Sequence, residues 1–211
     1  MTPWLEPLGG ALIVAVCACA AALAPQRMLA EANVRIPGSP ASAAIAAGVA
    51  GLLVYALFAA RGQWGVGCAL GVVTACLAAM ALVDACSLLI PDLHVVVLAV
   101  LAFVGPLAQG LPTALVGAAV GGGLLWGVAE LFRRTRGVVG LGLGDVKLMA
   151  AVGALAGPVT VLWIIVSASV LGAIWIASRS GWRFDRATPA PFGTAAALPA
   201  VVFLALEHLG S

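Results

Sequence analysis

The sequence predicts an all-α protein: a polytopic transmembrane helical bundle of about eight spans, with a short helix following a glycine-rich motif. Of its 211 residues 64% are hydrophobic and only 9% are charged, and the mean hydropathy is +1.18. A soluble domain carries about 25% charged residues, so this chain cannot cover a water-facing surface. We expect a single integral-membrane domain over residues 1–211, surrounded by membrane lipids.

The expected spans are apolar runs of roughly the length that crosses a bilayer. They are residues 8–24, 41–60, 64–83, 93–109, 112–132, 146–157, 158–178 and 192–209. Gly157-Pro158 separates the sixth run from the seventh, because proline cannot donate the helical hydrogen bond. The sixth run is too short for a full hydrocarbon core, and such helices are tolerated where they line a cavity. Small residues inside the runs predict close helix packing: Gly48, Gly51, Gly117, Gly121, Gly122 and Gly123.

Basic residues set the expected orientation. With eight spans and the N-terminus outside, one side of the membrane receives nine of the 10 Lys and Arg residues, and only Arg61 lies on the other. The nine are Arg27, Arg35, Arg133, Arg134, Arg136, Lys147, Arg179, Arg183 and Arg186. Because cytoplasmic loops carry the excess of Lys and Arg, that side is the cytoplasm. Asp84 and Asp145 then both lie at the cytoplasmic edge of the membrane, where they can meet.

These two aspartates are the candidate catalytic residues. Asp84 ends the apolar run that begins at Gly65, and Asp145 closes a glycine-rich stretch and leads into another apolar run. A carboxylate near the middle of a membrane helix costs about 2.5–3.5 kcal/mol on insertion scales, so such residues usually mark a pathway, a partner or a reaction. A pair at one membrane face suits an aspartic protease, in which one carboxyl is charged and the other protonated.

The residues next to these aspartates have more than one interpretation. Gly142 and Gly144 allow backbone angles closed to other residues and let backbone approach backbone, so a turning segment there could bring Asp145 beside Asp84. Lys147 is either a residue whose charge reaches the membrane interface or one that tunes Asp145. Elsewhere, the chain has no basic stripe interleaved with aromatic residues, so we expect no nucleic-acid partner. The five cysteines form no zinc-ligand pattern, and we expect no metal site.

Together these motifs resemble the type IV prepilin peptidases, membrane aspartic proteases of the G-x-G-D class. Members of that family have an aspartate six residues before an Ile-Pro pair, as Asp84 stands before Ile90-Pro91-Asp92. Their second motif, G-x-G-D-x-K-L, matches residues 142–148, and an Ala- and Gly-rich stretch follows in both. A third and weaker match is Pro191-Phe192-Gly193, where the family often continues with proline and this chain has Thr194.

The resemblance implies a reaction and a set of residues. The enzyme would remove the short basic leader from prepilins or pseudopilins at the cytoplasmic face of the bacterial inner membrane, serving pili, type II secretion or DNA uptake. Asp84 and Asp145 would be catalytic, Gly142, Gly144, Lys147 and Pro91 would support the motifs, and Asp92 is a weak candidate for attracting the leader. The peptidase chemistry requires no cofactor, and the oligomeric state does not follow from the sequence.

The chain departs from bifunctional members of that family in one segment. Those members carry a zinc-associated cytoplasmic loop with two C-x-x-C pairs, and they also methylate the cleaved pilin with S-adenosylmethionine. The corresponding segment here, Pro25 to Pro40, has no cysteine, so we expect the zinc-binding loop to be absent. S-adenosylmethionine would be a cofactor only if methylation is retained.

Two alternatives use the same aspartates. An ion- or proton-coupled transporter could employ Asp84 and Asp145 as relay groups, although the two halves of the chain show no inverted repeat. A presenilin-like protease shares G-x-G-D, but it has Tyr before the first aspartate and Pro-Ala-Leu near the end. This chain has Val83 before Asp84 and the order Leu198-Pro199-Ala200.

Overall fold

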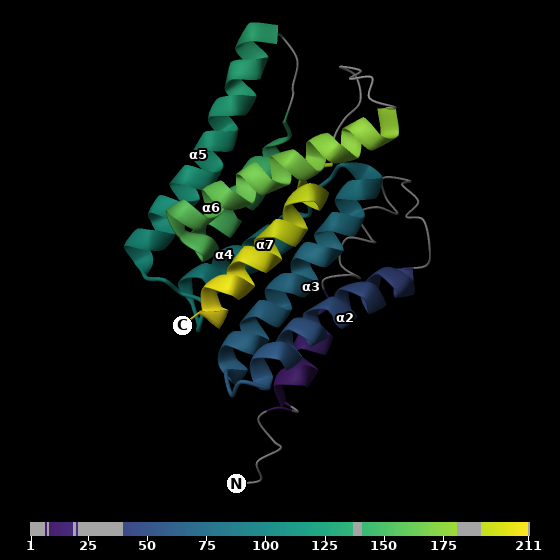
Figure 1. Ribbon diagram of the computed structural model, residues 1–211, viewed down its shortest axis with the longest axis vertical. Helices are drawn as coiled ribbons and strands as arrows, with labels where there is room; N and C mark the ends of the chain where they lie inside the picture. The colour runs from purple at the N-terminus through teal and green to yellow at the C-terminus, as the bar shows by residue number, and fades with distance from the viewer. Residues whose placement is uncertain are drawn as a thin grey trace.

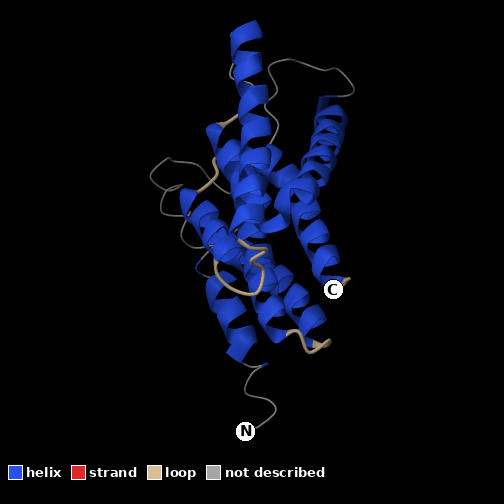
Figure 2. Ribbon diagram, turned by 90° about the vertical axis from the view of Figure 1, so that its left-hand side faces the viewer, coloured by secondary structure: helices blue, strands red, loops and turns tan. Residues whose placement is uncertain are grey.

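The computed structural model describes residues 9–18, 40–136, 141–180 and 191–210, together with residues 7 and 20. All regular elements in these ranges are helices (Figures 1 and 2). An N-terminal helical stretch covers Gly9–Ala18. The labelled helices are α2 (Pro40–Ala59), α3 (Trp64–Ser87), α4 (Asp92–Phe103), α5 (Leu111–Arg136), α6 (Leu143–Ser180) and α7 (Phe192–Leu209).

Four of the described helices are long and apolar enough to cross a membrane, judged by length and composition: Trp64–Ser87, Leu111–Thr135, Leu143–Ser178 and Phe192–Leu209. The apolar stretches Gly9–Ala18, Ala44–Ala59 and Asp92–Phe103 are shorter. The all-helical prediction is therefore confirmed, whereas the structure does not confirm eight full spans. The fourth expected run, residues 93–109, ends early as a helix, because Val104 has an extended backbone (φ −129°, ψ 125°) and Gly105 follows with a φ of 107°.

Helix α3 lies at the centre of the bundle. In space it packs between α2 and α7, while α6 packs between α7 and α5, and α4 lies mainly against α6 (Figure 1). Inside the protein, 72% of the most apolar stretch of α3 is buried, against 22–28% in the other three long helices. The long helices around α3 therefore direct much of their apolar surface outward, as helices facing lipid do.

The predicted break after the glycine-rich motif is present. Within α6, Gly157 leaves the helical conformation with φ 75° and ψ 173°, directly before Pro158. A Cβ built on Gly121 of α5 would collide with the backbone oxygen of Met149 and would lie 3.0 Å from Cγ2 of Val161. In a straight helix Met149 and Val161 would be about 18 Å apart. The two parts of α6 therefore bend back onto the same region of α5.

Most of the glycines expected at helix contacts are found there. A side chain on Gly117 would collide with the backbone of Gly153, one on Gly122 would lie 2.9 Å from the Cβ of Ala150, and one on Gly51 would lie 2.6 Å from the oxygen of Gly71. Gly123 is different, because no atom lies within 4 Å of a Cβ built there. Close helix approach thus explains the first three and does not explain Gly123.

Several sequence predictions fall outside the described residues. These are the cysteine-free segment from Pro25 up to the residue before Pro40, and most of the basic residues assigned to the first and seventh loops. The charged end of α5 is described: Glu130 accepts hydrogen bonds from Arg133 and Arg134 within the last turns of that helix. The orientation of the chain in a membrane stays a prediction.

Candidate active site

The candidate site lies where three helix ends meet: the end of α3, the start of α6 and the start of α7. Helix α3 continues four residues beyond the predicted end of the apolar run, so Asp84 lies in its last turn. Leu88 then adopts a left-handed conformation with φ 55° and ends the helix. A residue before a proline avoids the helical region, so Ile90 does not continue α3. Pro91 is itself extended, and α4 begins at Asp92.

Asp84 is buried and held by the start of α7. Its side chain is only 3% exposed. The backbone N–H of Thr194 donates to Oδ2 of Asp84 at 2.7 Å, the hydroxyl of Thr194 lies 3.0 Å from the same oxygen, and the backbone of Gly193 forms a further hydrogen bond. The first N–H groups of a helix have no acceptor within the helix, so they are available for this carboxylate.

Gly193 leaves no room for a side chain at this contact. A Cβ at this position would lie 3.1 Å from Oδ2 of Asp84, 3.2 Å from its Cγ and 3.2 Å from Cδ1 of Ile90. From the sequence, Pro191-Phe192-Gly193 was only a weak motif, and no role was predicted for Gly193 or Thr194. The signal was present in the position of this motif at the start of the last apolar run, but its partner lies about 110 residues earlier.

Asp145 lies in the first turn of α6. Its N–H donates to the oxygen of Gly142 at 3.1 Å, and its carboxyl group is also hydrogen-bonded to the Gly142 backbone. Asp145 is close enough to Asp84 for the two carboxyl groups to interact electrostatically. The structure therefore brings together the two aspartates that the sequence analysis singled out.

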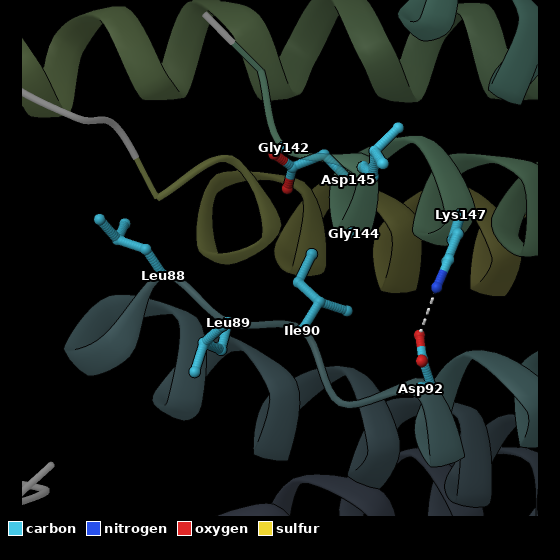
Figure 3. A pocket seen from close by; sticks show the side chains of 9 residues that line it. Leu88, Leu89, Ile90, Asp92, Gly142, Gly144, Asp145 and Lys147 are labelled. Carbon is cyan, nitrogen blue, oxygen red and sulfur yellow. Dashed lines mark hydrogen bonds and ion pairs between the residues drawn. The ribbon is translucent and has the colours of Figure 1, made fainter. Parts of the chain in front are cut away.

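The expectation for the glycines of the G-x-G-D motif is wrong in one respect. Among the described residues the glycines with positive φ are Gly62, Gly105, Gly110 and Gly157, so neither Gly142 nor Gly144 uses a backbone conformation restricted to glycine. Helix α6 begins within the motif, at Leu143. At Gly144 the lack of a side chain leaves room for Ile90. A Cβ on Gly144 would lie 3.1 Å from the Cβ of Ile90, and Figure 3 shows Ile90 between the α3–α4 segment and α6.

Lys147 has a defined partner. Its Nζ lies 2.9 Å from Oδ1 of Asp92 in an ion pair that joins the starts of α4 and α6 (Figure 3). Both side chains are more than half exposed, so the pair contributes little to stability by itself. Neither the interfacial interpretation nor the tuning of Asp145 anticipated this contact. Pro91, the other supporting residue, is buried and precedes the first residue of α4.

A cavity of about 340 Å³ opens beside Asp145. Its lining comes from the α3–α4 segment on one side and from the start of α6 on the other (Figure 3). The lining residues are Leu88, Leu89, Ile90, Asp92, Gly142, Leu143, Gly144, Asp145 and Lys147. Every motif-supporting residue that the sequence analysis named, except Pro91, borders this cavity.

A second, more apolar cavity of about 330 Å³ lies between the later part of α6 and the start of α7. Leu171, Ile174, Trp175 and Leu198 provide its apolar wall, and Thr194 borders it as well. Thr194 therefore borders this cavity and also contacts Asp84.

The arrangement can perform acid–base chemistry on a peptide. Two carboxyl groups that lie close together can exchange protons with a reacting group while one is charged and the other is not. The first cavity gives access to Asp145, and the second has a mostly apolar lining.

Comparison with known proteins gives a consistent result. The model of the type IV leader peptidase family matches residues 71–177. Proteins named prepilin leader peptidase/N-methyltransferase are similar to this chain: the one from Xanthomonas campestris is 43% identical over 124 residues, covering 56% of this chain and 42% of the relative. Those from Pseudomonas aeruginosa and Dichelobacter nodosus are 38% and 36% identical, over 56% of this chain and 42% and 41% of the relatives. The similarity thus spans less than half the length of these relatives. No solved structure matches the chain significantly.

Proposed function

Since the chain belongs to the type IV leader peptidase family, we propose that it is an aspartic endopeptidase that removes the leader from prepilins or pseudopilins. The observation that carries this proposal is the position of Asp145, which borders a cavity built from both family motifs and lies close enough to the buried Asp84 for the two charges to interact. The relatives are named as prepilin leader peptidases, which supports a prepilin substrate here.

In the proposed mechanism the two carboxyl groups share the proton transfers. The ionised one takes a proton from water, whose oxygen attacks the carbonyl carbon of the scissile bond. The protonated one donates a hydrogen bond to the carbonyl oxygen, where negative charge develops. The C–N bond then breaks as its nitrogen takes a proton from the pair. Two carboxyl groups this close cannot both ionise cheaply, so the pair acts as a unit.

We further propose that the substrate spans both cavities. The segment at the leader junction would lie in the cavity beside Asp145, and the apolar helix that follows would lie against Leu171, Ile174 and Leu198. Asp92 stays our candidate for contact with the basic leader. Because Asp92 is paired with Lys147, a basic group of the leader would have to exchange with that ammonium.

The proposed location is the bacterial inner membrane, with the site at the cytoplasmic face. Helix α3 supports this placement because Asp84 stands 21 residues after Gln63, or about 31 Å along the helix, close to the thickness of the hydrocarbon core. Asp84 and Gln63 would therefore lie at opposite faces. Methylation of the cleaved pilin with S-adenosylmethionine would be a separate activity. We propose that this chain lacks it.

Co-expression with a prepilin tests the proposal. Asp84→Asn and Asp145→Asn should each abolish leader removal, because an amide keeps the shape of the carboxyl group but cannot exchange its proton. Glu207→Gln is the control: Glu207 accepts a hydrogen bond from Gln109 near the other end of α7, and its loss should leave cleavage intact.

The readout is the mass and new N-terminus of the pilin, in membranes where each variant is present at the wild-type level. Normal processing by either Asn variant would refute the catalytic assignment. The same spectra report methylation as an increment of roughly 14 Da, the mass of one CH₂ unit, which we expect to be absent.

A further inference from the structure

Thr194, in the first turn of α7, is hydrogen-bonded to two groups of α3. Its N–H donates to Oδ2 of Asp84 at 2.7 Å. Its hydroxyl lies 3.0 Å from the same oxygen and 2.9 Å from the backbone oxygen of Ala81. Both contacts with Asp84 reach Oδ2, so Oδ1 is the oxygen that Thr194 leaves to the reaction.

The sequence supplies the donors for this contact at a position where the resembling family often lacks them. Thr194 stands where the resembling family often has a second proline, and proline has neither a backbone N–H nor a hydroxyl group. The N–H of Thr194 is available because it belongs to the first turn of α7, where no acceptor exists within the helix. The departure from the family motif therefore adds two donors at Asp84.

The hydroxyl has one proton and two acceptors. It can donate either to Oδ2 of Asp84 or to the oxygen of Ala81, but not to both in full. A charged carboxylate is the stronger acceptor, so it attracts the hydroxyl proton when Asp84 is ionised. When Asp84 has gained a proton at Oδ1, the hydroxyl can turn to Ala81.

We propose that Thr194 is a positioning residue for Asp84. It orients the carboxyl group through Oδ2, leaves Oδ1 to the reaction, and turns its hydroxyl between Oδ2 and the Ala81 oxygen as Asp84 loses and gains its charge. This proposal rests on the catalytic role of Asp84 proposed above. It predicts that the hydroxyl of Thr194, rather than its bulk, governs the rate of cleavage.

Two substitutions separate the hydroxyl from the shape of the side chain. Thr194→Val keeps the shape and the N–H but loses the hydroxyl, and it should lower kcat about tenfold without raising KM. Thr194→Ser keeps the hydroxyl and loses only a methyl group from the apolar cavity, so it should retain kcat within about threefold. Thr194→Pro, which loses both donors, should be slower than Thr194→Val.

The pH dependence gives a readout that a structural role would not change. Without the hydroxyl the charged form of Asp84 loses a donor, so the acid limb of the kcat profile should move to higher pH in Thr194→Val and stay in place in Thr194→Ser. The matched control is Thr74→Val. Thr74 lies on α3, the helix that carries Asp84, and its buried hydroxyl donates to the oxygen of Leu70 at 2.7 Å, far from the site. It should leave kcat and the profile unchanged.

The measurement uses the purified full chain in lipid vesicles with a synthetic prepilin. Wild-type kcat and pH profile in Thr194→Val would overturn the proposal, and so would an equal loss of kcat in Thr74→Val, because any buried hydroxyl would then have the same effect. Asp84→Asn distinguishes failure of the catalytic assignment of Asp84 from failure of the positioning role of Thr194. If that variant cleaves normally the catalytic assignment fails, whereas its inactivity together with a fully active Thr194→Val rejects only the role of Thr194.

Discussion

Gly193→Ala tests whether the start of α7 positions Asp84. The new Cβ would lie 3.1 Å from Oδ2 of Asp84 and 3.2 Å from both Cγ of Asp84 and Cδ1 of Ile90. Ordinary carbon contacts begin near 3.5 Å, so the carboxyl group must shift by about 0.3–0.5 Å. A misplacement of about 1 Å can cost a hundredfold in rate, and on that scale we expect cleavage to slow by about threefold to tenfold.

The stability of the variant should change little. Gly193 lies in a helix without positive φ, and alanine is favoured over glycine there by up to about 1 kcal/mol, which offsets part of the crowding. Gly123→Ala is the matched control, since no atom lies within 4 Å of its new Cβ, and it should cleave at the wild-type rate. Gly193→Val, with two further methyl groups in the same space, should be close to inactive.

The assay is the initial rate of leader removal by purified variants in vesicles, with thermal unfolding followed in parallel. The reasoning is refuted if Gly193→Ala cleaves as fast as the wild type, because Asp84 would then tolerate the displacement. A slow Gly193→Ala whose unfolding temperature also falls steeply would instead assign the effect to lost packing.

Two remaining predictions concern topology and metal. Reporter fusions after Arg134 and Arg183 should give a cytoplasmic signal, because cytoplasmic loops carry the excess of basic residues. A fusion after Gln63 should give an external signal, because about 31 Å of α3 separates Gln63 from Asp84. A cytoplasmic signal after Gln63 would contradict the placement of Asp84. Alanine at all five cysteines should cost about 1 kcal/mol or less of stability per buried site and leave cleavage intact. A chelator should also leave cleavage unchanged. Stoichiometric zinc whose removal stops cleavage would exclude a metal-independent peptidase.

Much of the helical framework could be predicted from local sequence. The apolar runs predicted helices because a chain this poor in charge can bury its backbone polar groups only within helices in a membrane. Gly157-Pro158 predicted the break in α6, because proline in the interior of a helix removes a backbone hydrogen bond. Asp84 and Asp145 stood out for a similarly local reason, the cost of a carboxylate in an apolar run.

The lengths of the helices were less predictable. The run 93–109 gave a helix that ends at Phe103, whereas α3 continues past Asp84 to Ser87. Hydropathy does not distinguish a helix from an apolar loop packed against its neighbours. The prediction of eight spans therefore counted apolar runs, while four described helices have the length and composition to cross a membrane.

The proposed acid–base chemistry was predicted from the sequence, but the arrangement of the candidate site depends on the tertiary structure. The prediction that Asp84 and Asp145 are catalytic rests on their residue types and sequence surroundings alone. That Asp84 is held by Thr194, that Gly193 must lack a side chain and that Lys147 pairs with Asp92 depend on contacts between residues 55 to 110 positions apart. Such contacts arise only when helix ends pack together, because the free N–H groups of one helix then meet a carboxylate from another.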